Sequence, residues 1–415
     1  MWLKTRLKGQ QLRKRAIEMI KISQRAEALE FSPIRKLMPM AVQAKAKGIK
    51  VYHLNIGQPD IESPKVFLKK VREFNQKVIA YEKSDGTEAL KNSLVRYYQR
   101  LNLNINQEDM VVTTGGSEAL WMAFFILFSK GDECLTLDPT YTSYLTFSAL
   151  GGVKLKAVPT YLEEDFQLPT IDKIKKSVTK KTKAIIITNP SNPTGSVYPK
   201  EMLKDLVDFC VKRGIFIIAD ETYREFVYEG KAVSLLSFKK ASQVVLLADS
   251  LSKRYSLCGA RIGVLVSKNK SIIKAALKMA QARLATASIE QYAASFLHQV
   301  PKEYFENVRR EYKKRRDTLM KGLGQINGVK FNSPDGAFYL IAELPVKNAE
   351  KFCQFLLEKF EDRRETIMLA PAEGFYVTPE TGKNQVRIAY VLNQKDLQRA
   401  CWLLKKGLEA YQRAE

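Results

Sequence analysis

The chain has 415 residues, with 68 lysines and arginines against 44 aspartates and glutamates, so its formal net charge is +24. Hydrophobic residues make up 45% of it, enough for sizeable buried cores, which excludes a generally disordered chain. No apolar run approaches the ~18–20 residues of a membrane span. The five cysteines and two histidines show no metal-ligand spacing, which favours a reduced cytoplasmic protein without a metal or a membrane partner.

The positive charge raises the question of nucleic acid. Residues 1–30 carry eight basic and three acidic residues, and the remaining +19 is spread along the chain in mixed runs. No aromatic-interleaved RNA motif or zinc-finger spacing is present, so we expect no specific nucleic acid partner, only nonspecific attraction of polyanions. Residues 1–17 are a basic surface helix, a translation start placed too early or a targeting peptide. Met19 offers an alternative start, and we expect this extension to be dispensable.

The first patterned segment begins at Ser32-Pro33-Ile34-Arg35, where a helical pattern leads to the run Val51–Asp60. Gly57 in this run is either an ordinary turn residue or a point where the backbone passes close to a ligand, which only glycine permits. A second loop, Tyr81–Gly86, precedes an amphipathic helix that we expect over residues 87–101.

Strands and helices then alternate. Apolar runs predict six strands, at residues 109–113, 133–137, 153–158, 184–188, 215–219 and 244–248. Such alternation predicts a mainly parallel sheet with helices on both faces. The turn Gly115-Gly116-Ser117 opens a helix expected over 118–129. A helix N-terminus binds phosphate readily, so this turn is either a phosphate cradle or an ordinary turn.

Three of these strands end in polar clusters, at the edge where open α/β sheets bind ligands. The clusters are Asn189–Gly195, Asp220–Tyr223 and Ser250–Lys253. Two hydroxyls and a lysine, with Arg261 eight residues further on, suit a phosphorylated cofactor that has a carbonyl to capture. Lys253 taken alone is equally well a solvated surface charge.

Beyond the helix-rich residues 270–325, strands at 329–331, 337–342 and 386–391 predict a smaller α+β domain. Arg387 is a charge inside an otherwise apolar strand. Its burial would be costly without an anionic partner, and a substrate α-carboxylate would be a bidentate one.

Other side chains at the strand ends have two interpretations each. Asp220 either caps a helix or keeps a pyridine nitrogen protonated. Tyr141 either packs in the core or stacks on a cofactor ring. Asn192 and Tyr223 could both hydrogen-bond a phenolic oxygen of that ring.

In this order the motifs resemble those of the class I/II aminotransferases, which are fold-type-I pyridoxal phosphate enzymes. The likeness runs from about Ser32 to Tyr411 and rests on five motifs: Gly115-Gly116-Ser117, Asn192-Pro193-Thr194-Gly195, Asp220-x-x-Tyr223, Ser250-x-Ser252-Lys253-x7-Arg261-x-Gly263 and Arg387. The stretches 32–37 and 54–59 are most similar to bacterial enzymes called aspartate aminotransferases.

The resemblance implies an α/β fold with a large, mainly parallel seven-stranded α/β/α domain and a smaller α+β domain. The implied division is a basic N-terminal extension at 1–31, a segment at 32–60 that packs with the small domain and the active site, a large cofactor-binding domain at 61–300 and a small C-terminal domain at 301–415. It also implies cis peptide bonds at Asp138–Pro139 and Asn192–Pro193, where proline makes that isomer accessible.

The resemblance further implies the catalytic roles. Lys253 would hold pyridoxal 5′-phosphate as a Schiff base and then move a proton between the substrate Cα and C4′ of the cofactor. Asp220 would pair with the pyridinium, and Asn192 and Tyr223 would hold the phenolic oxygen. The phosphate would be bound by Gly116, Ser117, Ser250, Ser252 and Arg261. Tyr141 would stack on the ring, and Arg387 would clamp the substrate α-carboxylate near the Gly57 backbone. The family also implies a homodimer with shared sites, in which Tyr81 reaches the neighbouring subunit's phosphate.

The expected function is a transaminase that moves the amino group of an L-amino acid such as aspartate to a 2-oxo acid such as 2-oxoglutarate by a ping-pong mechanism. A dicarboxylate needs a second cation, and the candidates are Arg35 and, from the partner subunit, Arg283. Either is equally well a surface salt-bridge residue. Ser117 stands where some aspartate-specific relatives have lysine, so the donor stays open.

Two alternatives remain. One is a pyridoxal phosphate lyase on the same fold, of the carbon–sulfur type, which shares these motifs. The other is a regulator with a DNA-binding module before an aminotransferase-like domain. Such a module needs ~60 residues for a core, and about 30 precede Ser32.

Overall fold

The computed structural model describes residues 21–27 and 29–414. The chain divides into two units, Met1–Phe31 and Ser32–Glu415. The described residues of the first unit include the short helix α2 (Gln24–Glu27). The predictions for residues 1–17 and for Met19 lie outside the described residues.

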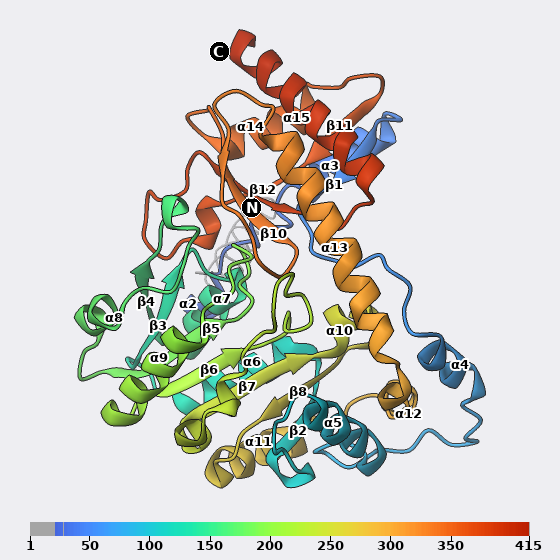
Figure 1. Cartoon of the computed structure of the whole chain (residues 1–415), viewed down its shortest axis with the longest axis vertical. Coiled ribbons are helices and arrows are strands. Elements are labelled where there is room, and N and C mark those ends of the chain that lie inside the picture. The colour runs from blue at the N-terminus through green and yellow to red at the C-terminus, as the bar shows by residue number, and fades with distance from the viewer. Residues whose placement is uncertain (1–20, 28, 415) are drawn as a thin grey trace, which may run out of the picture. The chain divides into compact units, whose positions relative to one another are not determined.

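A seven-stranded sheet with the strand order β2-β8-β7-β6-β5-β3-β4 occupies the lower half of the second unit in Figure 1. β8 runs antiparallel to both of its neighbours, and the other pairs are parallel, which confirms the expected sheet. The strands are β2 (Met110–Thr114), β3 (Glu133–Asp138), β4 (Lys154–Pro159), β5 (Thr182–Thr188), β6 (Phe216–Asp220), β7 (Val245–Ser250) and β8 (Ile262–Val266). β8 was not predicted from the sequence, because its glycine weakens the strand pattern of this short apolar run.

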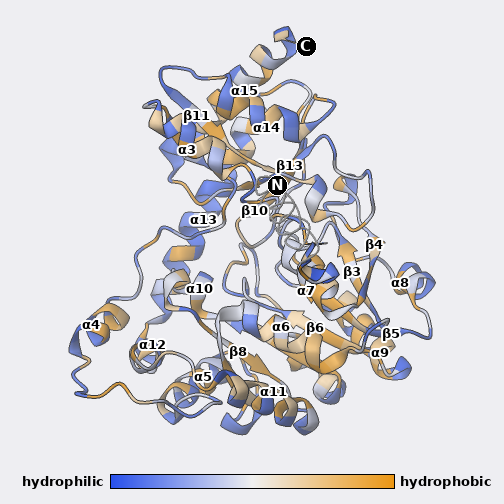
Figure 2. Cartoon of the chain, turned by 180° about the vertical axis from the view of Figure 1, so that it is seen from behind, coloured by the Kyte–Doolittle hydropathy of each residue, from blue (hydrophilic) through white to orange (hydrophobic). Residues whose placement is uncertain are grey.

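Helices cover both faces because the strands are apolar on both sides. The consecutive residues Ile185, Ile186 and Ile187 of β5 alternate between two buried clusters, and Figure 2 shows hydrophobic residues concentrated in this sheet. One cluster includes helices α6 (Gly115–Leu127), α7 (Thr142–Gly151) and α11 (Lys270–Arg283). The other includes α5 (Glu88–Arg100), α9 (Lys200–Arg213) and α12 (Ser288–Ala294). Other helices of the same region are α4 (Lys65–Glu73), α8 (Ile171–Ser177) and α10 (Leu251–Arg254).

A separate core unites the chain's C-terminal part with the segment that begins at Ser32. An antiparallel sheet of order β12-β13-β10-β9 and a parallel pair β1–β11 line it. The strands are β1 (Lys50–His53), β9 (Lys330–Phe331), β10 (Tyr339–Glu343), β11 (Glu365–Met368), β12 (Ala370–Pro371) and β13 (Gln385–Ala389). The helices are α3 (Met38–Ala46), α13 (Lys302–Leu323), α14 (Ala349–Glu358) and α15 (Gln394–Ala414).

Two local predictions need correction. The Asp138–Pro139 bond is cis as expected, but the second cis bond is Asn189–Pro190 rather than Asn192–Pro193. Two Asn-Pro pairs lie three residues apart, and proline makes the cis isomer accessible at both, so the motif alone could not tell them apart. In addition, α6 begins at Gly115, so the expected glycine turn forms the first turn of the helix.

Within residues 21–27 and 29–414, no helix is both long enough and apolar enough to cross a membrane. The same residues contain no group of three or more histidine, cysteine or acidic side chains placed to hold a metal ion.

Candidate active site

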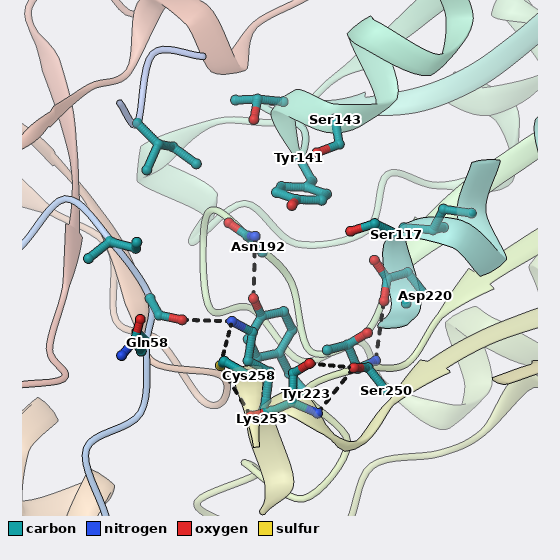
Figure 3. Close-up of a pocket in the computed structure, with 18 of the residues that line it drawn as sticks. Gln58, Ser117, Tyr141, Ser143, Asn192, Asp220, Tyr223, Ser250, Lys253 and Cys258 are labelled. Atoms are coloured by element: carbon teal, nitrogen blue, oxygen red, sulfur yellow. Dashed lines mark hydrogen bonds between the residues drawn. The ribbon is translucent and has the colours of Figure 1, made fainter. Parts of the chain in front are cut away.

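A cavity of about 760 Å³ opens at the carboxyl ends of β5, β6 and β7. Thirteen of the fifteen predicted site residues line it: Arg35, Gly57, Gly116, Ser117, Tyr141, Asn192, Asp220, Tyr223, Ser250, Ser252, Lys253, Arg261 and Arg387. Figure 3 shows how several of them converge from separate elements. The structure therefore brings together residues more than 300 positions apart in the sequence.

Lys253 lies on the short helix α10, directly after β7. Its Nζ donates a hydrogen bond to the Gly57 carbonyl oxygen at 2.7 Å and lies 3.9 Å from Cys258 Sγ (Figure 3). Burial lowers the pKa of the Lys253 ammonium, and the positive charges of Arg387 and Arg261 lower it further. The lowered pKa favours the neutral amine, which is the form that attacks a carbonyl.

Asp220 is the last residue of β6 and is buried. Its Oδ2 accepts a hydrogen bond from Tyr144 Oη at 2.8 Å, and its Oδ1 accepts one from the Thr222 N–H at 3.2 Å. Burial raises the pKa of this carboxyl, and these hydrogen bonds oppose the rise. No cation of the described chain pairs with Asp220, so a protonated ring nitrogen in the cavity would be its natural counter-ion.

Asn192 connects the two polar sides of the cavity. Its Nδ2 donates to Tyr223 Oη at 3.5 Å, and its Oδ1 accepts from Arg387 Nη1 at 3.0 Å. Tyr223 Oη also lies 2.9 Å from Tyr339 Oη. Burial raises the pKa of Tyr223 well above its usual range, so its hydroxyl keeps its proton and can donate to an oxygen anion.

The first turn of α6 faces the hydroxyls of Ser250, the last residue of β7, and of Ser252 on α10. Ser250 Oγ donates to Ser252 Oγ at 2.8 Å, and a Cβ on Gly116 would lie 3.3 Å from the Ser250 Cβ. Gly115 adopts a φ of +75°, and a Cβ there would lie 2.4 Å from Arg261 Nη2. Helix N–H groups, two hydroxyls and a guanidinium around one space form a cradle that fits a phosphate group.

Arg387 lies on β13 with 1% of its surface exposed. Its Nη1 and Nη2 donate to Asn192 Oδ1 and to the Asn55 carbonyl oxygen, while its Nε has no partner in the described chain. The Tyr339 and Phe375 rings lie 4.4 and 4.8 Å from the guanidinium. A buried cation without a protein anion, bordering the cavity, fits an anionic ligand.

Two predicted residues do not line the cavity of their own chain. Tyr81 is 81% exposed. Arg283 pairs with Glu118 at 3.1 Å and donates to the Ser84 carbonyl oxygen at 2.8 Å. The contributions of Tyr81 and Arg283 to a partner subunit's site stay predictions.

Three side chains of this site were not predicted from the sequence. Tyr144 binds Asp220, Tyr339 binds Tyr223, and Cys258 lies beside Lys253. A weak signal existed for Tyr144, which lies one helical turn after Tyr141. For Tyr339, the signal was a hydroxyl inside an apolar strand, the same signal that singled out Arg387.

A cavity at the strand ends, a lysine of lowered pKa, a buried carboxylate and a phosphate cradle define a fold-type-I pyridoxal-phosphate enzyme. The model of the aminotransferase class I and II family matches residues 49–404, and the chain belongs to this family. It is a pyridoxal-phosphate-dependent aminotransferase, and its cofactor fits the residues described above.

The chain is 31% identical to the aspartate aminotransferase of Bacillus subtilis, over 94% of this chain and all of that protein. The structure of Thermus thermophilus aspartate aminotransferase with maleate superposes with a TM-score of 0.86 at 27% identity. The structure of an alanine aminotransferase from Pyrococcus furiosus has the same TM-score at 30% identity. Both structures match 94% of this chain over their whole length. These relatives are transaminases, so neither the lyase nor the regulator alternative is favoured.

Proposed function

We propose that this enzyme transfers the amino group of L-aspartate to 2-oxoglutarate by a ping-pong mechanism. The observation that carries the proposal is Arg387, a buried guanidinium without an anionic protein partner, at the same cavity as Lys253. An amino acid whose α-carboxylate binds Arg387 would present its amino group and Cα towards Lys253. The aspartate names of several relatives support the choice of donor.

Each side chain has one task in this proposal. Bound pyridoxal phosphate supplies an electron sink that acidifies the Cα–H bond of an attached amino acid. Lys253 Nζ would accept the proton of the substrate Cα and later give it back, which its lowered pKa favours. Asp220 would keep the ring nitrogen protonated, while Tyr223 and Asn192 would hold the phenolic oxygen.

The remaining residues bind and orient. The cradle of Gly116, Ser117, Ser250, Ser252 and Arg261 holds the phosphate, and Tyr141 stacks on the ring. Arg35, from the segment before α3, binds the distal carboxylate of the donor. Arg35 is exposed where it lines the cavity, which leaves its charge available to a ligand.

The donor is tested by a panel of L-amino acids with 2-oxoglutarate. Arg35→Ala should lower kcat/KM for aspartate ~10- to 150-fold, the value of about 1.5–3 kcal/mol for a charged hydrogen bond, and leave alanine unchanged. Lys47→Ala is the matched control, because it removes a cation at the other end of α3 that does not line the cavity. No turnover of aspartate, or an equal loss with both donors, would contradict the proposal.

We also propose a homodimer with shared sites. Val78, Ile79 and Tyr81 are 74%, 61% and 81% exposed in one short stretch, and such apolar exposure is typical of an interface. On α6, the Trp121 and Phe125 rings pair at 4.6 Å and are also exposed.

Shared sites are tested by mixing two inactive variants. Tyr81→Ala and Lys253→Ala subunits should form hybrids in which one site has both wild-type residues, so activity should return to about a quarter of the wild-type value, as random pairing of the two subunits predicts. No recovery on refolding the mixture, with a dimer confirmed by light scattering, would show that Tyr81 does not act across the interface.

We propose a cytoplasmic location as well. All five cysteines are free thiols and four of them are buried, as expected for a protein of a reducing compartment. Fractionation of the source cells with an antibody against the chain tests this location.

A further inference from the structure

The carboxylate of Asp138 holds a loop of the small domain against the end of β3. Its Oδ1 accepts a hydrogen bond from the Val377 N–H at 2.7 Å, and its Oδ2 accepts one from the Thr378 N–H at 3.0 Å. Asp138 is the last residue of β3 and is 2% exposed. One carboxylate therefore satisfies two successive backbone donors of a segment more than 230 residues later.

A third hydrogen bond joins the same two segments. The Thr140 N–H donates to the Phe375 carbonyl oxygen at 2.7 Å. Tyr141, the next residue, lines the cavity, and the Phe375 ring lies 4.8 Å from the Arg387 guanidinium. These two segments thus connect Tyr141, on one side of the cavity, to Arg387 on the other. The Nε of Arg387 has no partner in the described chain.

We propose that Asp138 is a positioning residue for substrate binding. Its carboxylate fixes residues 375–378, so that Phe375 packs on Arg387 and the guanidinium keeps its orientation towards the cavity. The proposal rests on the proposed role of Arg387 as the α-carboxylate site. Because Asp138 acts through Phe375 and Arg387, its loss should weaken the binding of amino acid and oxo acid and leave the bound cofactor in place.

The two-donor geometry requires a carboxylate. Asparagine has the same shape but one acceptor oxygen, so its NH₂ group would face one of the two N–H groups. No cation of the described chain pairs with Asp138, and a buried carboxylate held by hydrogen bonds without a cation is costly to keep charged. Burial accordingly raises the pKa of Asp138, opposed by the hydrogen bonds from the 377–378 segment. Because this buried carboxylate is costly to keep charged, its presence is better explained by the ordering of residues 375–378 than by a contribution to fold stability alone.

The test compares Asp138→Asn with Phe375→Leu in the holoenzyme, with whichever amino donor the panel identifies. Each variant should raise KM for the donor and for the oxo acid about tenfold, with kcat and the affinity for pyridoxal phosphate unchanged within about twofold. The double variant should be no worse than the worse single one, because both changes act on one contact chain.

Asp132→Asn is the matched control. Asp132 lies just before β3 and also accepts a backbone N–H, from Ser129 at 2.8 Å, but it does not line the cavity. This variant should leave KM unchanged. A KM for Asp138→Asn equal to the wild-type value, or a parallel loss of kcat and cofactor affinity, would overturn the proposal.

Arg387→Lys separates the two proposals, because an ammonium cannot reproduce the planar fork. If Arg387→Lys leaves KM unchanged, the assignment of the carboxylate site is wrong, and the role of Asp138 falls with it. If Arg387→Lys raises KM while Asp138→Asn and Phe375→Leu do not, only the positioning role is wrong. Unfolding midpoints of all variants identify any loss that comes from an unfolded fraction.

Discussion

The ε-amino group of Lys253 lies 2.7 Å from the carbonyl oxygen of Gly57, a residue 196 positions earlier in the chain. This contact joins the end of β7 to the segment between β1 and α4. The Tyr339 hydroxyl lies on the other side of Gly57, where a Cβ would come within 1.8 Å of Tyr339 Oη. Gly57 therefore passes between the lysine and the tyrosine, and no larger residue fits there without moving one of them.

Gly57→Ala is expected to inactivate the enzyme. The added methyl group must displace either the backbone that accepts from Lys253 or the Tyr339 ring, which lies under Arg387. Overpacking of this kind costs about 1–3 kcal/mol of stability. Donor kinetics and urea unfolding measure both effects.

The matched control for this change is Gly324→Ala. Gly324 has a helical φ of −63° and its nearest neighbour lies 3.4 Å from a Cβ position, so alanine fits there. If Gly57→Ala retained the wild-type kcat/KM, the close approach of the backbone would have no bearing on the site.

Lys253→Ala should remove the absorbance band of the lysine-linked cofactor and abolish transamination. The reason is that Lys253 is the one lysine among the cavity-lining residues of the described chain, so no other amine can replace it there. Absorbance spectra of purified enzyme with added pyridoxal phosphate measure the first effect, and the donor assay measures the second. An unchanged spectrum would show that another residue holds the cofactor.

Tyr144→Phe should slow the reaction without emptying the site. The tyrosine donates to Asp220 at 2.8 Å and is fully buried, so phenylalanine keeps the packing and removes one donor to the carboxylate. With one hydrogen bond fewer, the pKa of Asp220 rises further and its carboxylate supports a protonated ring nitrogen less well. We expect kcat to fall about tenfold, the equivalent of ~1.4 kcal/mol.

The reference for this variant is Asp220→Asn, which should lose ~10²- to 10⁴-fold in kcat because the amide carries no charge. Equal losses for the two variants would mean that Tyr144 does more than support Asp220. No loss for Tyr144→Phe would mean that the Thr222 hydrogen bond alone is sufficient.

The sequence predicted the sheet and most of the cavity lining because these depend on local patterns. Asp220 and Lys253 each follow an apolar run, and parallel strands bring such ends to one edge. Arg387 was found because a charge interrupts an apolar strand. The family pattern then placed these separate signals in one site.

Other features depend on tertiary contacts that leave no local pattern. Tyr144 and Tyr339 look like ordinary core tyrosines, and only the fold brings them to Asp220 and Tyr223, which lie 76 and 116 residues away in the sequence. The cis bond at Asn189–Pro190 and the strand β8 were missed for the same reason, since proline and glycine allow several conformations that the surrounding structure selects. The catalytic roles of the cavity residues stay predictions that the variants above test.

The carboxylate of Asp249 lies one residue before Ser250 of the cavity lining. This carboxylate is fully buried and binds Arg254 at 2.6 Å and Arg224 at 3.2 Å. Asp249→Asn should lower the free energy of unfolding by about 3–5 kcal/mol at pH 7, because Arg254 would lose its only carboxylate partner in the described chain. The control is Asp172→Asn, because its solvent-exposed pair with Lys175 is screened by water and its loss should leave the free energy of unfolding nearly unchanged.

The pH dependence of this difference follows from the pKa of Asp249. Burial acts to raise it, but the two arginines outweigh burial and hold the pKa below its usual range. The unfolded chain then binds more protons than the folded one as the pH falls past about 3.9, so the stability due to Asp249 is present above that pH and is lost below it. Urea unfolding of wild type and Asp249→Asn from pH 7 to pH 3.5 should show the difference in free energy shrinking towards the acid end. A difference that stayed constant, or grew, would mean that Asp249 is not charged in the folded protein.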